Sequence, residues 1–330
     1  MKKILNFCTK YKKWIISFCL VFAVAYPWIF RSGYLISVGV NCLMYASISL
    51  SLNLIIGNLG QMSMGHAAFW GIGAYTSAIL STKLGMGSIG TLLVTIVVVA
   101  VFSFLLGMPV LKLKGYYMTV VTLGFCEIIR LVELNWTSLT RGALGISRIP
   151  SFTFFGHKVT NKIAIFYMAL GMLVVTVLIL QALINSKHGL AILAIRDDEI
   201  AAQSIGINMF YHKMIAFVIA GVIAGVNGAF YARFSSYIDS NLFNTGQSMN
   251  FAIFAIFGGL GNIAGVIGGT IFLTVLPEVL RFLSAYRTFL YGVLIIIVML
   301  IKPEGILGNV NFKYIAQKQK MESEEKEGKV

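Results

Sequence analysis

The stretch from residue 85 to residue 111 reads GMGSIGTLLVTIVVVAVFSFLLGMPVL and contains no charged residue. A helix that spans a membrane needs about 20 mostly apolar residues, so this stretch is long enough to span one with some tilt. The whole chain of 330 residues is similarly apolar, with 58% hydrophobic and 12% charged residues. Soluble domains carry about 25% charged residues. The composition therefore argues against a soluble enzyme, a secreted disulfide scaffold or a disordered chain, and predicts an all-α polytopic membrane protein.

Further apolar runs lie on both sides of this stretch, and we expect about ten transmembrane helices in total. The runs other than 85–111 are 14–30, 35–56, 61–82, 115–134, 163–184, 214–232, two helices within 240–277, and 288–301. A glycine-rich stretch, 258–262, is the expected turn between the two helices of 240–277. We interpret residues 1–308 as a single transmembrane domain and residues 309–330 as a charged tail.

The formal net charge of +14 would suit a nucleic-acid-binding protein, but here the basic residues flank apolar runs, so we expect no nucleic acid as a partner. Placing both termini in the cytoplasm puts 16 of the 26 Lys and Arg residues on the cytoplasmic side, as the positive-inside rule favours. The segment 187–213 is then cytoplasmic and the loop 135–162 is external. The four cysteines have no paired spacing, and we expect neither a disulfide nor a metal site.

The predicted cytoplasmic segment contains a charged cluster that leads into a short helix. Asp198 is placed to cap this helix, with Glu199 in its first turn. Its alanines could let another surface come close, and its charges could form ion pairs with a soluble partner. A solvated helix that docks on nothing is the alternative, and composition alone favours it. The candidate docking residues are Arg196, Asp197, Asp198, Glu199, Ala201, Ala202 and Gly206.

Polar residues within the predicted spans are the second feature. Uncharged polar groups and glycines inside a membrane can line a translocation path, because buried polar groups are costly unless paired or wetted. Close helix packing by small residues is the alternative for the glycines. Glu127 and Arg130 are three residues apart near a helix end, and we expect them to form an ion pair with each other rather than to contact the substrate. The candidate path residues are Gln61, Ser63, Gly65, His66, Thr119 and Thr122.

Taken in order, six motifs resemble those of the permease subunits of branched-chain amino-acid ABC importers. They are SLNLIIG at 51–57, GQMSMGHAAFWGIGAY at 60–75, LKGYYMTVVTLGFCEIIR at 113–130, AIRDDEIAAQSIGIN at 194–208, GGLGN at 258–262 and KPEGILG at 302–308. The resemblance implies an ABC importer permease fold in the bacterial inner membrane. It also implies a second, homologous permease, two ATP-binding subunits and an external amino-acid-binding protein as partners. In such importers the segment matching 199–206 docks on the ATP-binding subunit.

The resemblance implies transport of Leu, Ile and Val, although the family also includes transporters of urea, short amides and other small solutes. The sequence contains no G-x-x-x-x-G-K-[ST] nucleotide-binding loop, so we expect a non-catalytic subunit that binds no cofactor, with ATP and Mg bound by its partners. A stand-alone secondary transporter is the first alternative and usually needs acidic residues in mid-membrane. A membrane-embedded enzyme is the second, with Asp197, Asp198 and His66 as its only candidate groups.

Overall fold

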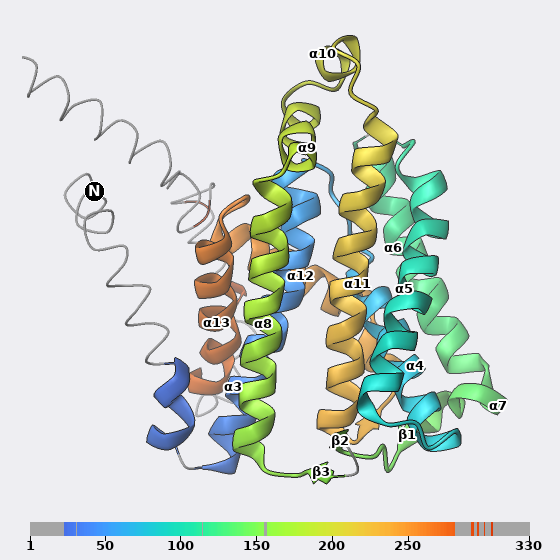
Figure 1. Ribbon diagram of the computed structural model, residues 1–330, viewed down its shortest axis with the longest axis vertical. Coiled ribbons are helices and arrows are strands. Elements are labelled where there is room, and N and C mark those ends of the chain that lie inside the picture. The colour runs from blue at the N-terminus through green and yellow to red at the C-terminus, as the bar shows by residue number, and fades with distance from the viewer. Residues whose placement is uncertain are drawn as a thin grey trace, which may run out of the picture.

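The computed structural model describes residues 23–280 except 31, 114, 155 and 156, together with residues 292, 293, 296, 300 and 305. The described part is mostly helical, and its long helices run side by side (Figure 1). These helices are α3 (Gly33–Asn53), α4 (His66–Lys83), α5 (Ser88–Val110), α6 (Tyr116–Asn135), α8 (Lys162–Ile184), α11 (Met209–Ser235), α12 (Thr245–Gly258) and α13 (Ile263–Val279).

Short elements occupy the two ends of this bundle. One end holds α9 (Lys187–Asp197) and α10 (Glu199–Ser204), and the opposite end holds α7 (Thr137–Thr140) and the strands β1 (Ile146–Ser147), β2 (Phe152–Phe154) and β3 (His157–Val159) (Figure 1). The segments 135–162 and 187–213 therefore lie at opposite ends. Which of them faces the cytoplasm stays a prediction.

The described part is mostly helical, as expected, and it also contains four short strands that the sequence did not predict. β1 pairs antiparallel with β4 (Tyr237–Ile238), with Ile146 opposite Ile238, and β2 pairs antiparallel with β3. Two 3₁₀ helices, η2 (Gly142–Leu144) and η3 (Ser240–Phe243), adjoin these strands in the chain. Strands of two or three residues are too short to produce a periodic pattern, so the sequence indicated only a polar loop.

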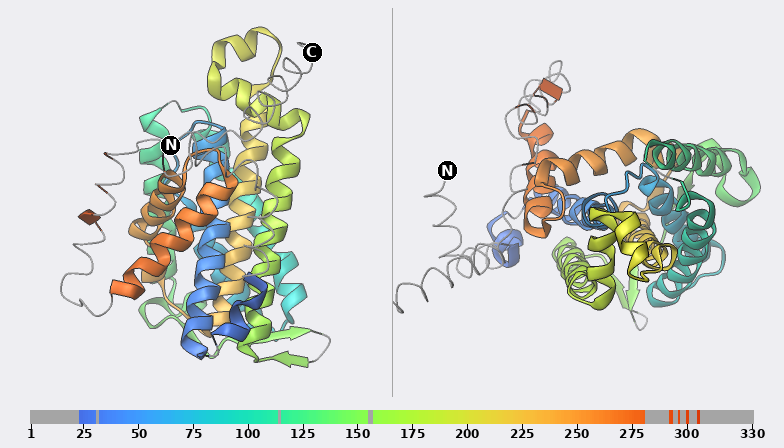
Figure 2. Two further views of the ribbon diagram at one scale, coloured as in Figure 1. Left: turned by 90° about the vertical axis from the view of Figure 1, so that its left-hand side faces the viewer. Right: turned by 90° about the horizontal axis from the view of Figure 1, so that it is seen from above.

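The interior of the bundle is formed by α3, α4 and α11, while α5 and α8 lie on its outside (Figure 2). Glycines allow the inner helices to approach very closely. A Cβ on Gly73 of α4 would lie 2.0 Å from the carbonyl oxygen of Gly225 on α11. A Cβ on Gly269 would lie 2.6 Å from the Cα of Gly258. These glycines therefore pack helices of this chain against one another.

By length and composition, four helices of the described part can cross a membrane: Gly33–Asn58, Ser88–Val110, Lys162–Ile184 and Met209–Ser235. The predicted total of about ten is not reached by this criterion. The expected spans at 14–30 and 288–301 fall largely outside the described residues, and the tail at 309–330 falls wholly outside them. The turn predicted at 258–262 is confirmed, since α12 ends at Gly258 and α13 begins at Ile263.

Candidate functional site

Two helices, rather than the single one expected, occupy the segment 187–213. The side chain of Ser186 accepts a hydrogen bond from the backbone N–H of Gly189 at 3.3 Å and caps α9. Asp198 has an extended backbone that forms the corner between α9 and α10. Its Oδ1 accepts from the N–H groups of Ile200 and Ala201 at 2.8 and 3.0 Å. The cap predicted at Asp198 is therefore confirmed, and it begins the short helix α10.

An ion pair fixes α10 to the start of α11. Lys213 Nζ donates to Glu199 Oε1 at 2.6 Å, and only 5% of the Lys213 side chain is exposed. A buried ammonium needs a partner, because an uncompensated buried charge is strongly destabilising. Glu199 therefore holds the helix in place, in addition to any contact that it makes with another protein.

The exposed face of α10 differs from the one expected. Ala202 is buried, at 2% exposure, so the predicted docking surface of alanines is wrong at this position, while Ala201 is exposed. The large exposed side chains are Ile200 and Ile205, each at 75%. Gly206 has φ +83°, a left-handed conformation that glycine adopts without strain, and it follows the last turn of α10. The exposed apolar side chains at α10 are therefore Ile200, in its first turn, and Ile205, the residue that follows its end.

A pocket of about 420 Å³ brings the two predicted sets of residues together. Gln61 and Thr119, predicted for the path, line it from one side, and the run from Arg196 to Glu199 lines it from the other. Arg196 lies against the backbone of Gly60, where a Cβ would be 3.0 Å from Arg196 Cγ. The charged end of α9 thus contacts the segment that leads into α4.

That segment, residues 59–65, is not helical, which corrects the expected span at 61–82: the helix α4 begins only at His66. Side chains of α6 hold the segment by hydrogen bonds. The Met64 N–H donates to Thr122 Oγ1 at 3.0 Å, and Thr119 Oγ1 donates to the Met62 carbonyl at 3.2 Å. Thr122 is fully buried, so its observed role is to tether the segment.

The remaining predicted path residues lie behind the pocket. Ser63 and His66 are fully buried, and Gly65 packs on Thr122, where a Cβ would lie 3.0 Å from the Thr122 carbonyl oxygen. The Ser63 hydroxyl and both ring nitrogens of His66 have no hydrogen-bond partner among the described residues. Unpaired buried polar groups are costly, so these atoms favour a polar partner.

Two residues to which the sequence assigned no role connect the end of α3 and the π-helix that follows it to the turn after α12. Asn53, at the end of α3, accepts a hydrogen bond from the Gly261 N–H at 2.9 Å. Gly57 lies in the π-helix η1 (Leu54–Asn58), and a Cβ there would lie 2.4 Å from the Gly261 nitrogen. Short π-helical segments occur frequently at functional sites. Both residues belong to the motif SLNLIIG, which marked this stretch in the sequence. Their partner Gly261 belongs to the motif GGLGN and lies 208 positions after Asn53.

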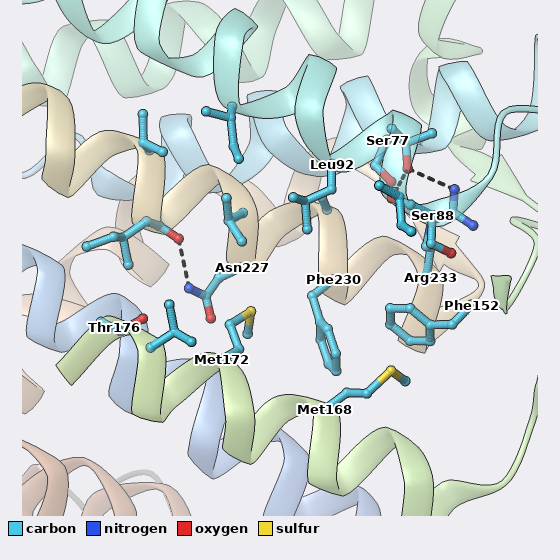
Figure 3. Close-up of a pocket in the computed structure, with 18 of the residues that line it drawn as sticks. Ser77, Ser88, Leu92, Phe152, Met168, Met172, Thr176, Asn227, Phe230 and Arg233 are labelled. Atoms are coloured by element: carbon cyan, nitrogen blue, oxygen red, sulfur yellow. Dashed lines mark hydrogen bonds between the residues drawn. The ribbon is translucent and has the colours of Figure 1, made fainter. Parts of the chain in front are cut away.

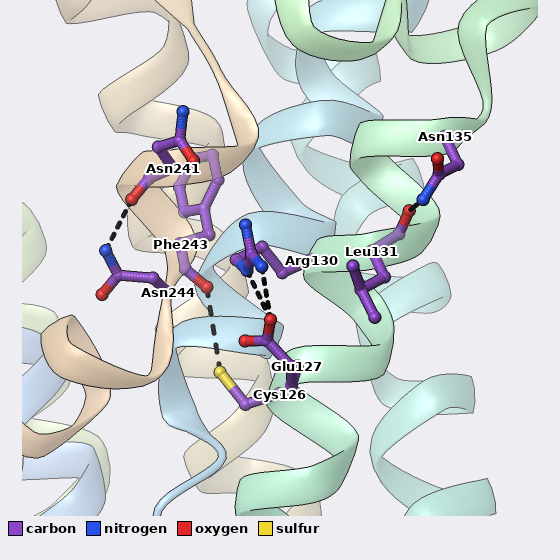
Figure 4. A network of polar contacts seen from close by, with 8 residues as sticks. All are labelled: Cys126, Glu127, Arg130, Leu131, Asn135, Asn241, Phe243 and Asn244. Carbon is purple, nitrogen blue, oxygen red and sulfur yellow. Dashed lines mark hydrogen bonds and ion pairs between the residues drawn. The ribbon is translucent and has the colours of Figure 1, made fainter.

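The ion pair predicted on α6 is present (Figure 4). Arg130 Nε donates to Glu127 Oε1 at 2.9 Å. The thiol of Cys126, the residue before Glu127, faces the Phe243 carbonyl of η3. Glu133, two turns further on, is buried, and its carboxylate has no hydrogen-bond partner in the described part. Within the same residues no group of three or more His, Cys, Asp or Glu could hold a metal ion.

Comparison with known proteins gives these features a family context. The family described as the branched-chain amino acid transport system permease component matches residues 34–299. The chain is 32% identical over 311 residues to the high-affinity branched-chain amino acid transport system permease protein LivM of Escherichia coli K12. That match covers 87% of this chain and 73% of LivM. No solved structure matches the chain.

A second permease of the same organism is also similar. LivH of Escherichia coli K12, named as a permease protein of the high-affinity branched-chain amino acid transport system, is 27% identical over 286 residues, covering 80% of this chain and 91% of LivH. The probable branched-chain amino acid transport permease protein LivM of Methanocaldococcus jannaschii is 22% identical over 312 residues. The family match spans most of the chain and all the helices described above, so the chain belongs to the branched-chain amino acid transport permease family.

Proposed function

We propose that this chain is the transmembrane permease subunit of an ATP-binding-cassette importer in a bacterial inner membrane. Together with a second permease it forms the path for Leu, Ile and Val, which an external binding protein delivers. The relatives support this, because both LivM and LivH are named as permeases of one transport system in one organism. The greater identity to LivM suggests a LivH-like protein as the second permease.

The observation that carries the proposal is the position of α10. It stands at one end of the bundle (Figure 1). The Asp198 cap and the Glu199–Lys213 ion pair hold it there, and Ile200 and the following Ile205 are exposed. Two exposed isoleucines, one in α10 and one at its C-terminal end, suit an apolar groove on a partner. In this proposal the groove belongs to an ATP-binding subunit, and α10 transmits its movement.

The contacts of α9 give that movement a route into the membrane part. Arg196 lies against Gly60 and near Gly261, and the pocket beneath it is lined by Gln61 and Thr119. A partner can shift the equilibrium between two conformations only by contacting them differently. Displacing α9 and α10 changes the contacts of Arg196 with residues 59–61 and with the turn after α12. We infer that this rearrangement exposes Gln61, Ser63 and His66 to the passing amino acid.

Substituting the exposed face of α10 tests the coupling. Ile200→Asp combined with Ile205→Asp places two carboxylates where an apolar interface is expected and leaves the buried side of the helix intact. We expect co-purification with the ATP-binding subunits and leucine uptake to fall by about tenfold or more, as for loss of a central interface residue. The matched control is Leu144→Asp, an 82% exposed leucine at the other end of the bundle. Unchanged uptake in the double variant removes α10 from the coupling role.

The solute is tested by the same complementation in a strain deleted for the chain. Wild-type protein is expected to restore uptake of radiolabelled leucine and not of urea. Uptake of urea alone would leave the importer part of the proposal standing and show that the solute is urea rather than leucine, because family members for urea and short amides share these motifs. Leucine transport by this chain alone in liposomes, driven by an ion gradient, would instead establish the secondary-transporter alternative and overturn the proposal.

A further inference from the structure

A long apolar groove runs between α5, α8 and α11 (Figure 3). It shares no lining residue with the pocket under α9. Its volume is about 490 Å³. Most of its lining is aliphatic, aromatic or thioether, with Leu92 on α5, Met168 and Met172 on α8, and Phe230 on α11. On α11 the lining runs from residue 222 to residue 233, which is about 16 Å at 1.5 Å per residue.

The groove opens on the outer surface of the bundle. Val175 and Ile179, which form its rim on α8, are 54% and 42% exposed, and Leu92 on α5 is 39% exposed. Both α5 and α8 are apolar enough to span a membrane and are mostly unburied within this chain. In a bilayer such a surface meets lipid tails, and a long apolar groove of this kind suits a single acyl chain.

Arg233, at one end of the groove, supplies the second observation. It is only 3% exposed. Among the residues that the structure describes, its guanidinium donates only to neutral oxygens: Thr91 Oγ1 at 2.9 Å and the carbonyls of Met86, Pro150 and Ser151 at 3.2 to 3.4 Å. Its Nε is buried and has no hydrogen-bond partner among the described residues. A buried guanidinium with neutral partners keeps its full positive charge uncompensated, which favours a nearby anion.

The surroundings of Arg233 strengthen this charge. The same side chain lines a second pocket, of about 390 Å³, in which the other cationic residue is Lys162 at the start of α8. None of the described residues that line either pocket is Asp or Glu. The end of the groove is therefore positively charged, while the rest of it is apolar.

We propose that this groove binds one anionic phospholipid, with an acyl chain between α5, α8 and α11 and the phosphate at the Arg233 end. The apolar length and the charged end match the two parts of such a lipid, and guanidinium groups bind phosphate oxygens through charge-assisted hydrogen bonds. The proposal requires the chain to lie in a membrane, and it is independent of which solute is transported.

Native mass spectrometry of the full-length chain, purified in mild detergent with any subunits that accompany it, tests the assignment. Phosphatidylglycerol and phosphatidylcholine are added at equal concentrations and the lipid adducts are compared. We expect phosphatidylglycerol to be preferred by about tenfold, the equivalent of one charge-assisted contact. Arg233→Gln should remove that preference. The control is Lys83→Gln, which deletes a cation at the same end that donates to the Ser138 carbonyl and lines neither pocket.

A second variant keeps the test decisive if Arg233→Gln fails to fold. Val175→Trp fills the groove from its exposed rim and leaves Arg233 in place, so adducts of both lipids should fall. Equal binding of the two lipids by wild type, or unchanged binding in Val175→Trp, would overturn the proposal. If Val175→Trp instead released a second permease subunit from the purified complex, the occupant of the groove would be protein and the lipid assignment would be wrong.

Discussion

At the scale of single residues, the Glu199–Lys213 ion pair is the contact on which α10 most depends. Glu199→Ala leaves the buried ammonium of Lys213 without its carboxylate, and we expect a loss of about 3 kcal/mol in stability. The measurement is the apparent melting temperature in detergent. Asp197→Ala, which removes an exposed carboxylate from the preceding helix, is the control and should have little effect.

A double-mutant cycle distinguishes the pair from a simple loss of charge. Lys213→Met removes the buried charge, so combining it with Glu199→Ala should cost less than the two single substitutions added together. Strictly additive losses would show that the two side chains act independently, and would contradict the assigned pairing.

The same residues show what could be predicted from the sequence at this scale. The Asp198 cap was predictable because a cap bonds to N–H groups two and three residues away. The partner of Glu199 was not, because Lys213 lies 14 positions away and meets it only through the packing of α10 on α11. The burial of Ala202 was missed for the same reason, since the inward side of a six-residue helix is set by its neighbours.

At the scale of elements, the closest approach of two long helices is the crossing of α4 and α11, where glycines leave room for the two backbones to meet. A larger side chain at Gly73 collides with the backbone of Gly225, which cannot move as a flexible side chain can. We expect Gly73→Leu to destabilise the chain by about 3 kcal/mol or more and to reduce the folded yield after purification. Gly171→Leu on α8, where nothing lies within 4 Å of an added Cβ, is the matched control.

A Gly73→Leu protein with wild-type yield and melting temperature would show that the two helices are not held at this distance in the membrane. That outcome would also weaken the inferred position of residues 59–65, since α4 continues directly from this segment.

The elements themselves were partly predictable. Uninterrupted apolar runs correctly indicated α3, α5, α8 and α11, because hydropathy over about 20 residues needs no tertiary information. The non-helical segment 59–65 was missed, since its composition continues that of α4. It is stabilised by Thr119 and Thr122 of α6, contacts that the apolar pattern does not encode. The π-helix η1 has the same apolar pattern as an α-helix and was missed as well.

At the scale of the whole molecule, the arrangement of the two ends is the property that the function requires. Segments 135–162 and 187–213 lie at opposite ends of the bundle, so only one of them can meet a cytoplasmic partner (Figure 1). The predicted count of spans depended on hydropathy alone. Helices such as α6, with Glu127, Arg130 and Glu133, pack against other helices and need not be apolar throughout, which is why the count stays a prediction.

The most direct test of the account is the side of the membrane on which α10 lies. Ile205→Cys and Leu144→Cys are each introduced into a variant without the native cysteines, and intact cells are treated with a membrane-impermeant maleimide. Both positions are highly exposed in the chain alone, at 75% and 82%. The chain is therefore produced without the ATP-binding subunits, so that no docked partner covers Ile205→Cys and the side of the membrane alone decides labelling. The account predicts that Leu144→Cys is labelled in intact cells and that Ile205→Cys is labelled only after permeabilisation. Labelling of Ile205→Cys in intact cells would place α10 outside, beyond the reach of an ATP-binding subunit, and would contradict the account.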